Sequence, residues 1–291
     1  MVNPNLLNMD EDFLYHINIK VDKDTNDIKK QFGDIKFVCL GGTKSRMAAL
    51  AEHLREVLQI DQNKELIDLG ESGHRYAVYK VGPVLCCSHG IGMASMSVLL
   101  HELIKLVKYA ECIDPVFMRI GTCGGLGVPP GTVVVTKDAY NGYLRNEHQI
   151  AVLGENIVRP AYFDSSVNSK IIKCHESTDN FELVIGNTLG TDCFYEGQGR
   201  LDGALCNYTL QDKMSFLKKC YELGIKNIEM EATMFSSLAL ATGIKAADIC
   251  VTILNRLNGD QVIVTMAEKV EFEKRPFIVV GRYIKQNLQS N

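Results

Sequence analysis

The sequence lacks the features that mark membrane, secreted and nucleic-acid-binding proteins. No apolar stretch approaches the roughly 20 residues of a membrane-spanning helix. The opening residues, 1–16, are polar and acidic, unlike a signal peptide, in which a basic segment precedes an apolar one. The net charge of -4 gives no overall attraction to nucleic acid. We therefore expect a soluble, cytoplasmic protein with no membrane or nucleic-acid partner.

The sequence also lacks an ordered cysteine pattern. Its 10 cysteines have no framework spacing and no CxxC pair, and only Cys86 and Cys87 are adjacent. Cys174 and His175 form a single pair with no second pair at metal-ligand spacing. We expect free thiols in a reducing compartment and no metal site.

Linkers and repeats are missing as well, which favours one domain. The composition, 46% hydrophobic and 23% charged, is that of a globular protein with ample length for a core. Short apolar runs alternate with segments of helical spacing, which predicts an α/β domain around a mixed sheet. The expected strands are 35–40, 76–81, 84–87, 116–120, 132–136, 183–187, 227–230 and 246–254. The expected helices are 45–58, 94–109, 213–223, 232–241 and 268–288.

Two segments have no clear pattern. Residues 1–30 are polar, and we expect them to wrap over a body that begins later. Residues 141–180 are mixed and polar, which predicts loops with one helix. Pro276 lies in the last helical segment and is expected to break or restart it.

Glycines follow three of the expected strands. They are Gly41-Gly42, Gly90 to Gly92, and Gly121 to Gly127. In α/β sheets ligands gather at the carboxyl ends of strands. These three turns therefore predict the position of a binding site.

The third turn, RIGTCGGLG at 119–127, contains the most informative residue. Arg119 follows a buried strand, and burying an unpaired guanidinium is costly, so the site must supply an anion or a carboxylate. Thr122 and the glycines would bring N–H groups close to a bound oxyanion or phosphate. A structural salt bridge on Arg119 would explain the same residues, and this segment alone does not decide between the two.

The first turn, GGTKSR at 41–46, has similar chemistry. A strand, two glycines and the start of a helix can bind an anion through backbone N–H groups. Arg46 falls in the first helical turn, where a cation opposes the helix dipole unless it serves a bound anion. The alternative is an exposed arginine at a helix start.

Two further motifs each present a pair of polar side chains. Glu229 and Glu231 are two residues apart in an extended segment, so both carboxylates point to one side. They could be a glycosidase-like acid and nucleophile, or could accept hydrogen bonds from a sugar diol. They could also form a solvated strand end paired with Lys226.

Gln198 and Arg200 form the second pair. Their side chains suit the imide edge of a base such as uracil, or they form a polar surface loop.

Two histidines and a cysteine are candidates for other roles. His16 and His89 could each act as a general base, although a lone histidine is more often structural, and we expect this for His89. Cys123 could be a nucleophile of lowered pKa beside the arginines. We favour packing roles for Cys123 and for Cys86.

Taken together, the motifs resemble those of the uridine phosphorylases, especially their eukaryotic branch. The ordered set is GG-x-x-S-R, H-R-Y, S-H-G-x-G, R-I-G-T-x-G-G, E-G-Q-G-R-L-D-G-A, I-E-M-E and N-R-L-x-G-D-Q, between about residues 3 and 285. The resemblance implies a nucleoside phosphorylase-like fold, a single-domain three-layer α/β sandwich around a mixed, distorted, barrel-like sheet. It also implies an N-terminal extension, 1–30, that contributes to a dimer and its active site, and a catalytic domain, 31–291.

The resemblance implies a role for each site residue. The phosphate-binding residues are Gly42, Arg46, Arg75, Arg119 and Thr122, with Arg75 supplied by the neighbouring subunit. The ribose-binding residues are Glu229, Met230, Glu231 and His16, the last reaching across the dimer interface. The uracil-binding residues are Phe194, Gln198, Arg200, Ile253 and Val262. The implied catalytic residues are Arg200, Gln198, Arg119 and Thr122.

The implied reaction is the reversible phosphorolysis of uridine to uracil and ribose 1-phosphate in pyrimidine salvage. Phosphate is a co-substrate, no metal or organic cofactor is required, and the expected assembly is a homodimer with shared active sites. Deoxyuridine and thymidine are further candidate substrates, and Val262, smaller than the isoleucine often found there, could loosen the pocket. Two alternatives are an inactive or weak uracil-nucleoside-binding paralogue and a purine-type nucleoside phosphorylase, which Gln198 and Arg200 disfavour.

Overall fold

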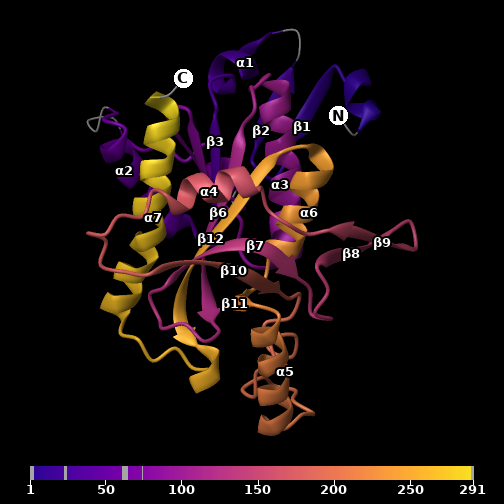
Figure 1. Cartoon of the computed structure of the whole chain (residues 1–291). Coiled ribbons are helices and arrows are strands. Elements are labelled where there is room, and N and C mark those ends of the chain that lie inside the picture. Colours follow the sequence, from indigo (N-terminus) through magenta and orange to yellow (C-terminus); the bar gives the residue numbers. More distant parts are fainter. Residues whose placement is uncertain (1–2, 23–24, 61–64, 74, 290–291) are drawn as a thin grey trace.

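An eight-stranded mixed sheet forms the centre of the protein (Figure 1). The structure is a computed structural model that describes residues 3–22, 25–60, 65–73 and 75–289. The strand order is β11-β10-β7-β12-β6-β3-β5-β4, and a further pairing of β11 with β6 closes five strands into a barrel. These strands are β3 (Phe37–Gly41), β4 (Val78–Val81), β5 (Val84–Ser88), β6 (Val116–Gly125), β7 (Val133–Tyr140), β10 (Leu183–Gly190), β11 (Ile225–Glu229) and β12 (Lys245–Asn255). The predicted α/β fold around a mixed, barrel-like sheet is confirmed.

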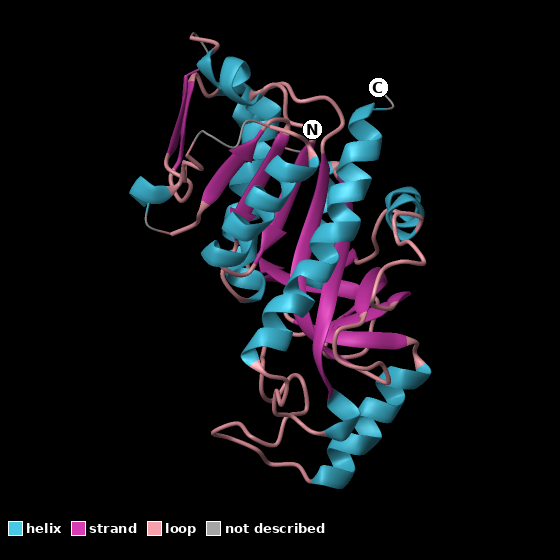
Figure 2. Ribbon diagram, turned by 90° about the vertical axis from the view of Figure 1, so that its left-hand side faces the viewer, coloured by secondary structure: helices cyan, strands magenta, loops and turns pink. Residues whose placement is uncertain are grey.

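Helices cover both faces of this sheet (Figure 2). The α-helices are α1 (Asp27–Phe32), α2 (Lys44–Val57), α3 (Gly92–Tyr109), α4 (Ser165–Ile172), α5 (Leu210–Glu222), α6 (Ala232–Thr242) and α7 (Met266–Gln289). Short 3-10 helices are η1 (Pro4–Asn8), η2 (Glu71–Gly73) and η3 (Arg256–Asn258). Among the described residues, no helix is both long and apolar enough to cross a bilayer.

The alternation of side chains along the strands builds two cores. In β3, Val38 and Leu40 pack with α1, α3 and α6, whereas Phe37 and Cys39 pack with α2, α4 and α7. Successive strand residues point to opposite faces, so a strand that is apolar at every position serves both cores at once. This explains why the buried strands read as continuous apolar runs in the sequence.

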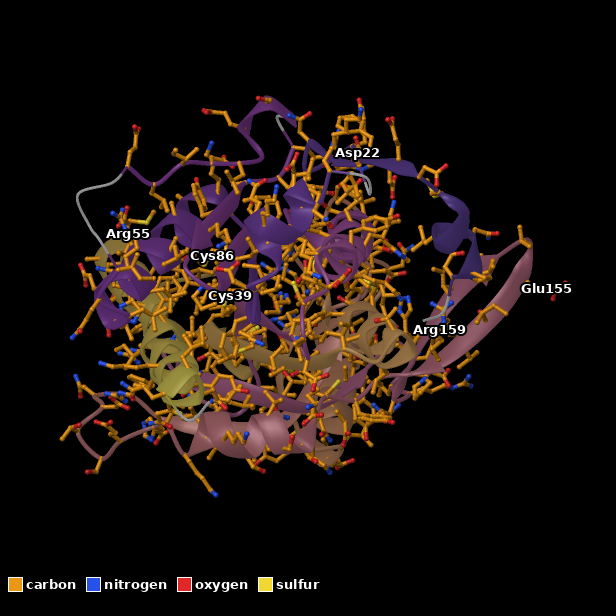
Figure 3. All side chains as sticks on the ribbon, turned by 90° about the horizontal axis from the view of Figure 1, so that it is seen from above. Asp22, Cys39, Arg55, Cys86, Glu155 and Arg159 are labelled. Carbon is orange, nitrogen blue, oxygen red and sulfur yellow. The ribbon has the colours of Figure 1, made fainter. Side chains whose placement is uncertain are left out.

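Two hairpins lie outside the main sheet. β1 (Glu11–Leu14) pairs with β2 (Ile19–Asp22), and β8 (Glu147–Val152) pairs with β9 (Glu155–Pro160). Seen from above, the second hairpin projects from the body with Glu155 at its tip, whereas Cys39 and Cys86 lie close together in the interior (Figure 3). Cys39 and Cys86 are register partners on β3 and β5, and all ten cysteines are free thiols, as expected.

Three local predictions were wrong. The glycines after Arg119 do not begin a turn, because β6 continues through Gly125. The segment 141–180 contains the predicted helix, α4, but also the β8–β9 hairpin. Pro276 does not interrupt α7, which is continuous.

The stability of the protein should depend strongly on Leu40, which packs in one of the two cores. Leu40→Ala removes a fully buried side chain, so we expect the free energy of unfolding to fall by about 2–5 kcal/mol. Leu153→Ala, the same change at the exposed hairpin tip, should alter it by less than about 0.5 kcal/mol. Urea unfolding of both variants measures this, and equal losses would contradict the core assignment.

Candidate active site

A cavity of about 460 Å³ lies where β6, β11 and β12 meet the starts of α2 and α3. It contains all the residues predicted for the site except His16 and Arg75. Its lining residues are Gly42, Thr43, Arg46, His89, Gly90, Ile91, Arg119, Gly121, Thr122, Cys123, Gly124, Phe194, Gln198, Arg200, Ile228, Glu229, Met230, Glu231, Ile253, Leu254, Arg256 and Val262. The three predicted glycine segments thus converge on one site, as expected for strand ends in one sheet.

Arg119 is the most heavily paired residue of the cavity. Its Nη1 lies 2.8 Å from Asp248 Oδ1 and 3.1 Å from Glu229 Oε2, and its Nη2 contacts Glu231 Oε2. All four side chains are at most 4% exposed. The structural salt bridge that the sequence allowed is therefore present, and Arg119 also lines the cavity, while binding of an oxyanion or phosphate there stays a prediction.

The register of the sheet explains how Arg119 meets Asp248. β6 and β12 are parallel, and Asp248 is the register partner of Arg119. Gly121 leaves room for the guanidinium, because a Cβ there would lie 3.1 Å from Arg119 Nη2 and 3.1 Å from Cys250 Sγ. Gly121, Gly124 and Gly125 therefore serve close packing inside a strand, and only Gly127, at a φ of 72°, lies beyond it.

The two glutamates after β11 differ in their electrostatics. Burial raises the pKa of Glu229 to about 8, with the Asp248 and Glu231 charges adding to it and Arg119 opposing it. Burial also acts to raise the pKa of Glu231, but Arg119 and His89 outweigh it, so that pKa is lowered. Glu229 also accepts the N–H groups of Glu231 and Ala232, at 2.7 and 3.0 Å, where α6 begins.

The start of α2 forms a second wall. Thr43 caps this helix by accepting a hydrogen bond from the Arg46 N–H. The Arg46 side chain is 10% exposed and its Nη2 donates to Glu273 Oε1 at 2.7 Å. The alternative of an exposed arginine is therefore wrong, and the helix N-terminus with Arg46 offers donors to an anion.

Gln198, Arg200 and Phe194 form the opposite end of the cavity. The Arg200 guanidinium lies 4.3 Å from the centroid of the Phe194 ring and pairs with both oxygens of Asp202 at 2.9 Å. The loop alternative for Gln198 and Arg200 is wrong in one respect, because both side chains are buried.

The sequence arguments gave no role to Arg256, which holds Gln198 in place. Its Nη2 donates to Gln198 O at 2.9 Å and its Nη1 to Gln198 Oε1 at 3.4 Å. Asp260 pairs with Arg256 at 2.9 Å, and Gly124 leaves space for the Arg256 stem. Arg256 takes one of the two lone pairs of this amide oxygen, so the second lone pair and the amide nitrogen of Gln198 are both left for a ligand.

Asp248 was missed as well. Its signal was present, since it is a charged residue inside the apolar strand AADICVTIL. Only the pairing of β12 with β6 shows that its partner is Arg119, and no local pattern contains that information.

His89 lines the cavity, although we had expected a structural histidine outside the site chemistry. Its backbone N–H donates to Gly41 O at 2.7 Å, and its carbonyl accepts from Ser95 Oγ at 2.7 Å. The ring is 1% exposed, and neither nitrogen has a hydrogen-bond partner among the described residues. Burial lowers its pKa to about 4, Glu231 opposes the shift, and Arg119 and Arg46 add to it.

His16 and Arg75 lie away from the cavity. His16 Nδ1 is 2.6 Å from Glu102 Oε1 on α3, and its ring is 6.4 Å from that of Tyr76, the neighbour of Arg75. Arg75 is exposed. The two residues predicted to serve a neighbouring subunit thus do not line the cavity of their own chain.

Cys123 sits on the cavity wall beside Cys250, whose thiol accepts a hydrogen bond from Arg119 Nη1 at 3.0 Å. A hydrogen bond to Cys39 and burial raise the pKa of the Cys86 thiol well above its usual value. The packing role proposed for Cys86 agrees with its full burial.

Comparison with known proteins identifies the family. The family described as the phosphorylase superfamily matches residues 36–284. Uridine phosphorylase 1 of Mus musculus is 44% identical over 98% of this chain and 92% of its own length. Inactive uridine phosphorylase B of Schistosoma mansoni is 36% identical, with 99% and 96% covered. The structure of uridine phosphorylase from Schistosoma mansoni in complex with thymine matches with a TM-score of 0.93 and 37% identity, over 99% of this chain and 100% of that one. The chain therefore belongs to the phosphorylase superfamily and, within it, to the uridine phosphorylase family.

The burial of His89 predicts a pH dependence of stability. The folded-state pKa, about 4, lies below the ordinary value of 6.5, so the unfolded chain binds more protons between these values. The stability that neutral His89 contributes is present above pH 6.5 and is lost as the pH falls toward 4, by up to about 3 kcal/mol. Urea unfolding of wild type and His89→Asn at several pH values tests this. Identical pH slopes for the two proteins would contradict it.

Proposed function

We propose that this protein catalyses the reversible phosphorolysis of uridine, giving uracil and ribose 1-phosphate. The observation that carries this proposal is one cavity lined by two chemically different groups of residues. Arg46, Arg119 and Thr122 form one group, and Gln198, Arg200 and Phe194 form the other. An anion site and an imide-reading site on one cavity suit a nucleoside attacked by phosphate.

The residues expected to bind the base account for the activation of uracil as the leaving group. The amide of Gln198 and the guanidinium of Arg200 bond the uracil carbonyls and N3–H, while Phe194 packs near the ring. Negative charge flows into the base as the glycosidic bond breaks, and Arg200 stabilises it most in the transition state. Ile253 and Val262 supply the apolar wall.

The residues of the anion site account for the attack of phosphate on the sugar. Phosphate is held by Arg46, Arg119 and Thr122 with the N–H groups near Gly42, and it attacks the anomeric carbon from the face opposite to the base. The ribose becomes oxocarbenium-like, with its hydroxyls bound near Met230 and Glu231. Positioning and charge supply the rate, so no covalent intermediate, metal or organic cofactor takes part.

A second copy of the chain completes each site in this proposal. His16 and Arg75 do not line their own cavity, and His16 is paired with Glu102, which supports a homodimer in which they reach the partner's cavity. A symmetric interface would place both pairs at once. The free thiols support a reducing, cytoplasmic setting.

Replacing Arg200 tests the reaction. Arg200→Ala should lower kcat/KM for uridine with phosphate by about 100- to 1,000-fold, because the developing charge on uracil loses its stabilising donor. Arg282→Ala, which breaks a pair with Asp179 outside the cavity, should leave it unchanged. Uracil release is followed by absorbance.

Two outcomes of this assay would reject the proposal. Faster hypoxanthine release from inosine than uracil release from uridine would indicate a purine-type enzyme. No turnover of either nucleoside by the unmutated protein would indicate a binding protein.

Mixed dimers test the shared site. Arg75→Ala and Arg200→Ala should each be nearly inactive alone. Co-expressed, they should regain part of the wild-type activity, because the cavity of the Arg75→Ala subunit keeps its own Arg200 and receives an intact Arg75 from its partner. Purified heterodimers with no more activity than either parent would show that Arg75 does not act across an interface.

A further inference from the structure

Three carboxylates surround one guanidinium in the cavity wall. Glu229, Glu231 and Asp248 all pair with Arg119, and none of the four side chains is more than 4% exposed. Fully ionised, this cluster would carry a net charge of -2 where little water can screen it. Uncompensated buried charge is costly, and groups in this position keep or gain a proton instead.

The other groups facing the cluster do not supply the missing positive charge. Arg46 on α2 forms an ion pair with Glu273 at 2.7 Å, so its positive charge is already balanced. His89, before α3, is neutral at neutral pH, since burial lowers its pKa to about 4. Cys250 on β12 is a neutral thiol, because its pKa is raised well above the usual value by a hydrogen bond to Cys123 and by burial.

Backbone dipoles offset only part of the charge. Glu231 Oε1 accepts the Gly92 N–H at 2.5 Å, and Glu229 accepts the N–H groups of Glu231 and Ala232. The start of a helix such as α6 is equivalent to about half a positive charge. A deficit of positive charge remains, and one proton on the carboxylates would reduce it.

The positions of the two glutamates show where that proton belongs. Glu229 Oε2 lies 3.1 Å from Nη1 of Arg119 and Glu231 Oε2 contacts Nη2 of the same guanidinium, whereas Asp248 Oδ2 is already taken by the Thr136 hydroxyl at 2.7 Å. Two neighbouring buried carboxyl groups cannot both ionise readily, so such pairs hold one proton between them. We propose that Glu229 and Glu231 share one proton at neutral pH, and that this proton permits the neighbouring site to accept a divalent oxyanion.

This inference rests on the proposed function, because the oxyanion is the phosphate of that reaction. With the proton in place, the cluster carries a net charge of -1 and the anion meets Arg119 with only that residual charge beside it. Loss of the proton adds a second negative charge next to the anion. Anion affinity therefore falls as the pair ionises, approaching about tenfold per pH unit for a single linked proton.

Sulfate is the appropriate probe, because phosphate itself titrates near neutrality and sulfate does not. Isothermal titration calorimetry measures its affinity for the wild-type protein between about pH 6.5 and 9.5, which brackets the ionisation of the pair. The affinity should be constant at the lower end and fall above about pH 8. Glu229→Gln, whose amide donates to Glu231 as the protonated acid would, should keep its affinity across the range.

Glu273→Gln is the matched control. It also removes one carboxylate bonded to an arginine of the anion site, but among the described residues this arginine is paired with that one carboxylate alone. Its affinity should shift by a similar factor at every pH and keep the wild-type fall above about pH 8. A wild-type affinity that does not change with pH, or a Glu229→Gln variant that follows the wild-type curve, overturns the shared proton.

Infrared difference spectroscopy of the unmutated protein decides the question even if Glu229→Gln does not fold or sulfate does not bind. The C=O stretch of a protonated carboxyl group should be present at neutral pH and disappear as the pH is raised to about 9.5. Its absence at neutral pH overturns the proposal. If the band is present but sulfate fails to bind at any pH, the anion site of the proposed function fails and the shared proton stands.

Discussion

The burial of Arg119 is the constraint on which the rest of the site depends. A guanidinium at 4% exposure requires partners, and the sheet supplies them from two neighbouring strands, Asp248 on β12 and Glu229 at the end of β11. Removing Arg119 itself would leave three buried carboxyl groups without their cation, which costs several kcal/mol. The same pairing leaves Arg119 at the cavity wall, so a requirement of folding places a cation where an anion can reach it.

Closure of the five-stranded barrel makes this arrangement possible. At Arg119, β6 lies between β12 and β3, and β11 pairs with β6 further on, at Gly124 and Gly125. The Arg119 side chain reaches Asp248 on β12 and Glu229 at the end of β11. The arginine side chains can pack this close to β6 only where β6 has no side chain of its own. Gly121 leaves room for Arg119, and Gly124 leaves room for Arg256. Arg256 in turn orients Gln198, so both ends of the cavity depend on close packing against one strand.

Much of the fold and part of the site could be predicted from the sequence. Doubly buried strands such as β3 are apolar at every position, and each predicted strand of the sheet is present. The roles of Arg46, Gln198 and Glu231 came from a family resemblance, and their convergence on one cavity agrees with it. The residues alone had left each of them with a structural alternative.

The failures have physical causes. A glycine in the sequence usually indicates a turn. Gly121 and Gly124 instead leave room for an arginine side chain that packs against the strand, and no local sequence pattern shows this contact. The β8–β9 hairpin is mostly exposed on both faces, so it has no alternating pattern, and its tight turn uses Leu153 and Gly154, both at positive φ. Asp248 was visible as a charge in an apolar strand, but its meaning required the register with β6.

The most direct test is to locate the anion. A crystal structure of the protein grown with phosphate and uracil should show phosphate within hydrogen-bond distance of Arg119 and Thr122, with Arg119 still paired to Asp248. Uracil should lie against Gln198 and Arg200. Phosphate bound elsewhere, with Arg119 shielded by its three carboxylates, would contradict the claim that the buried guanidinium serves both the fold and the reaction.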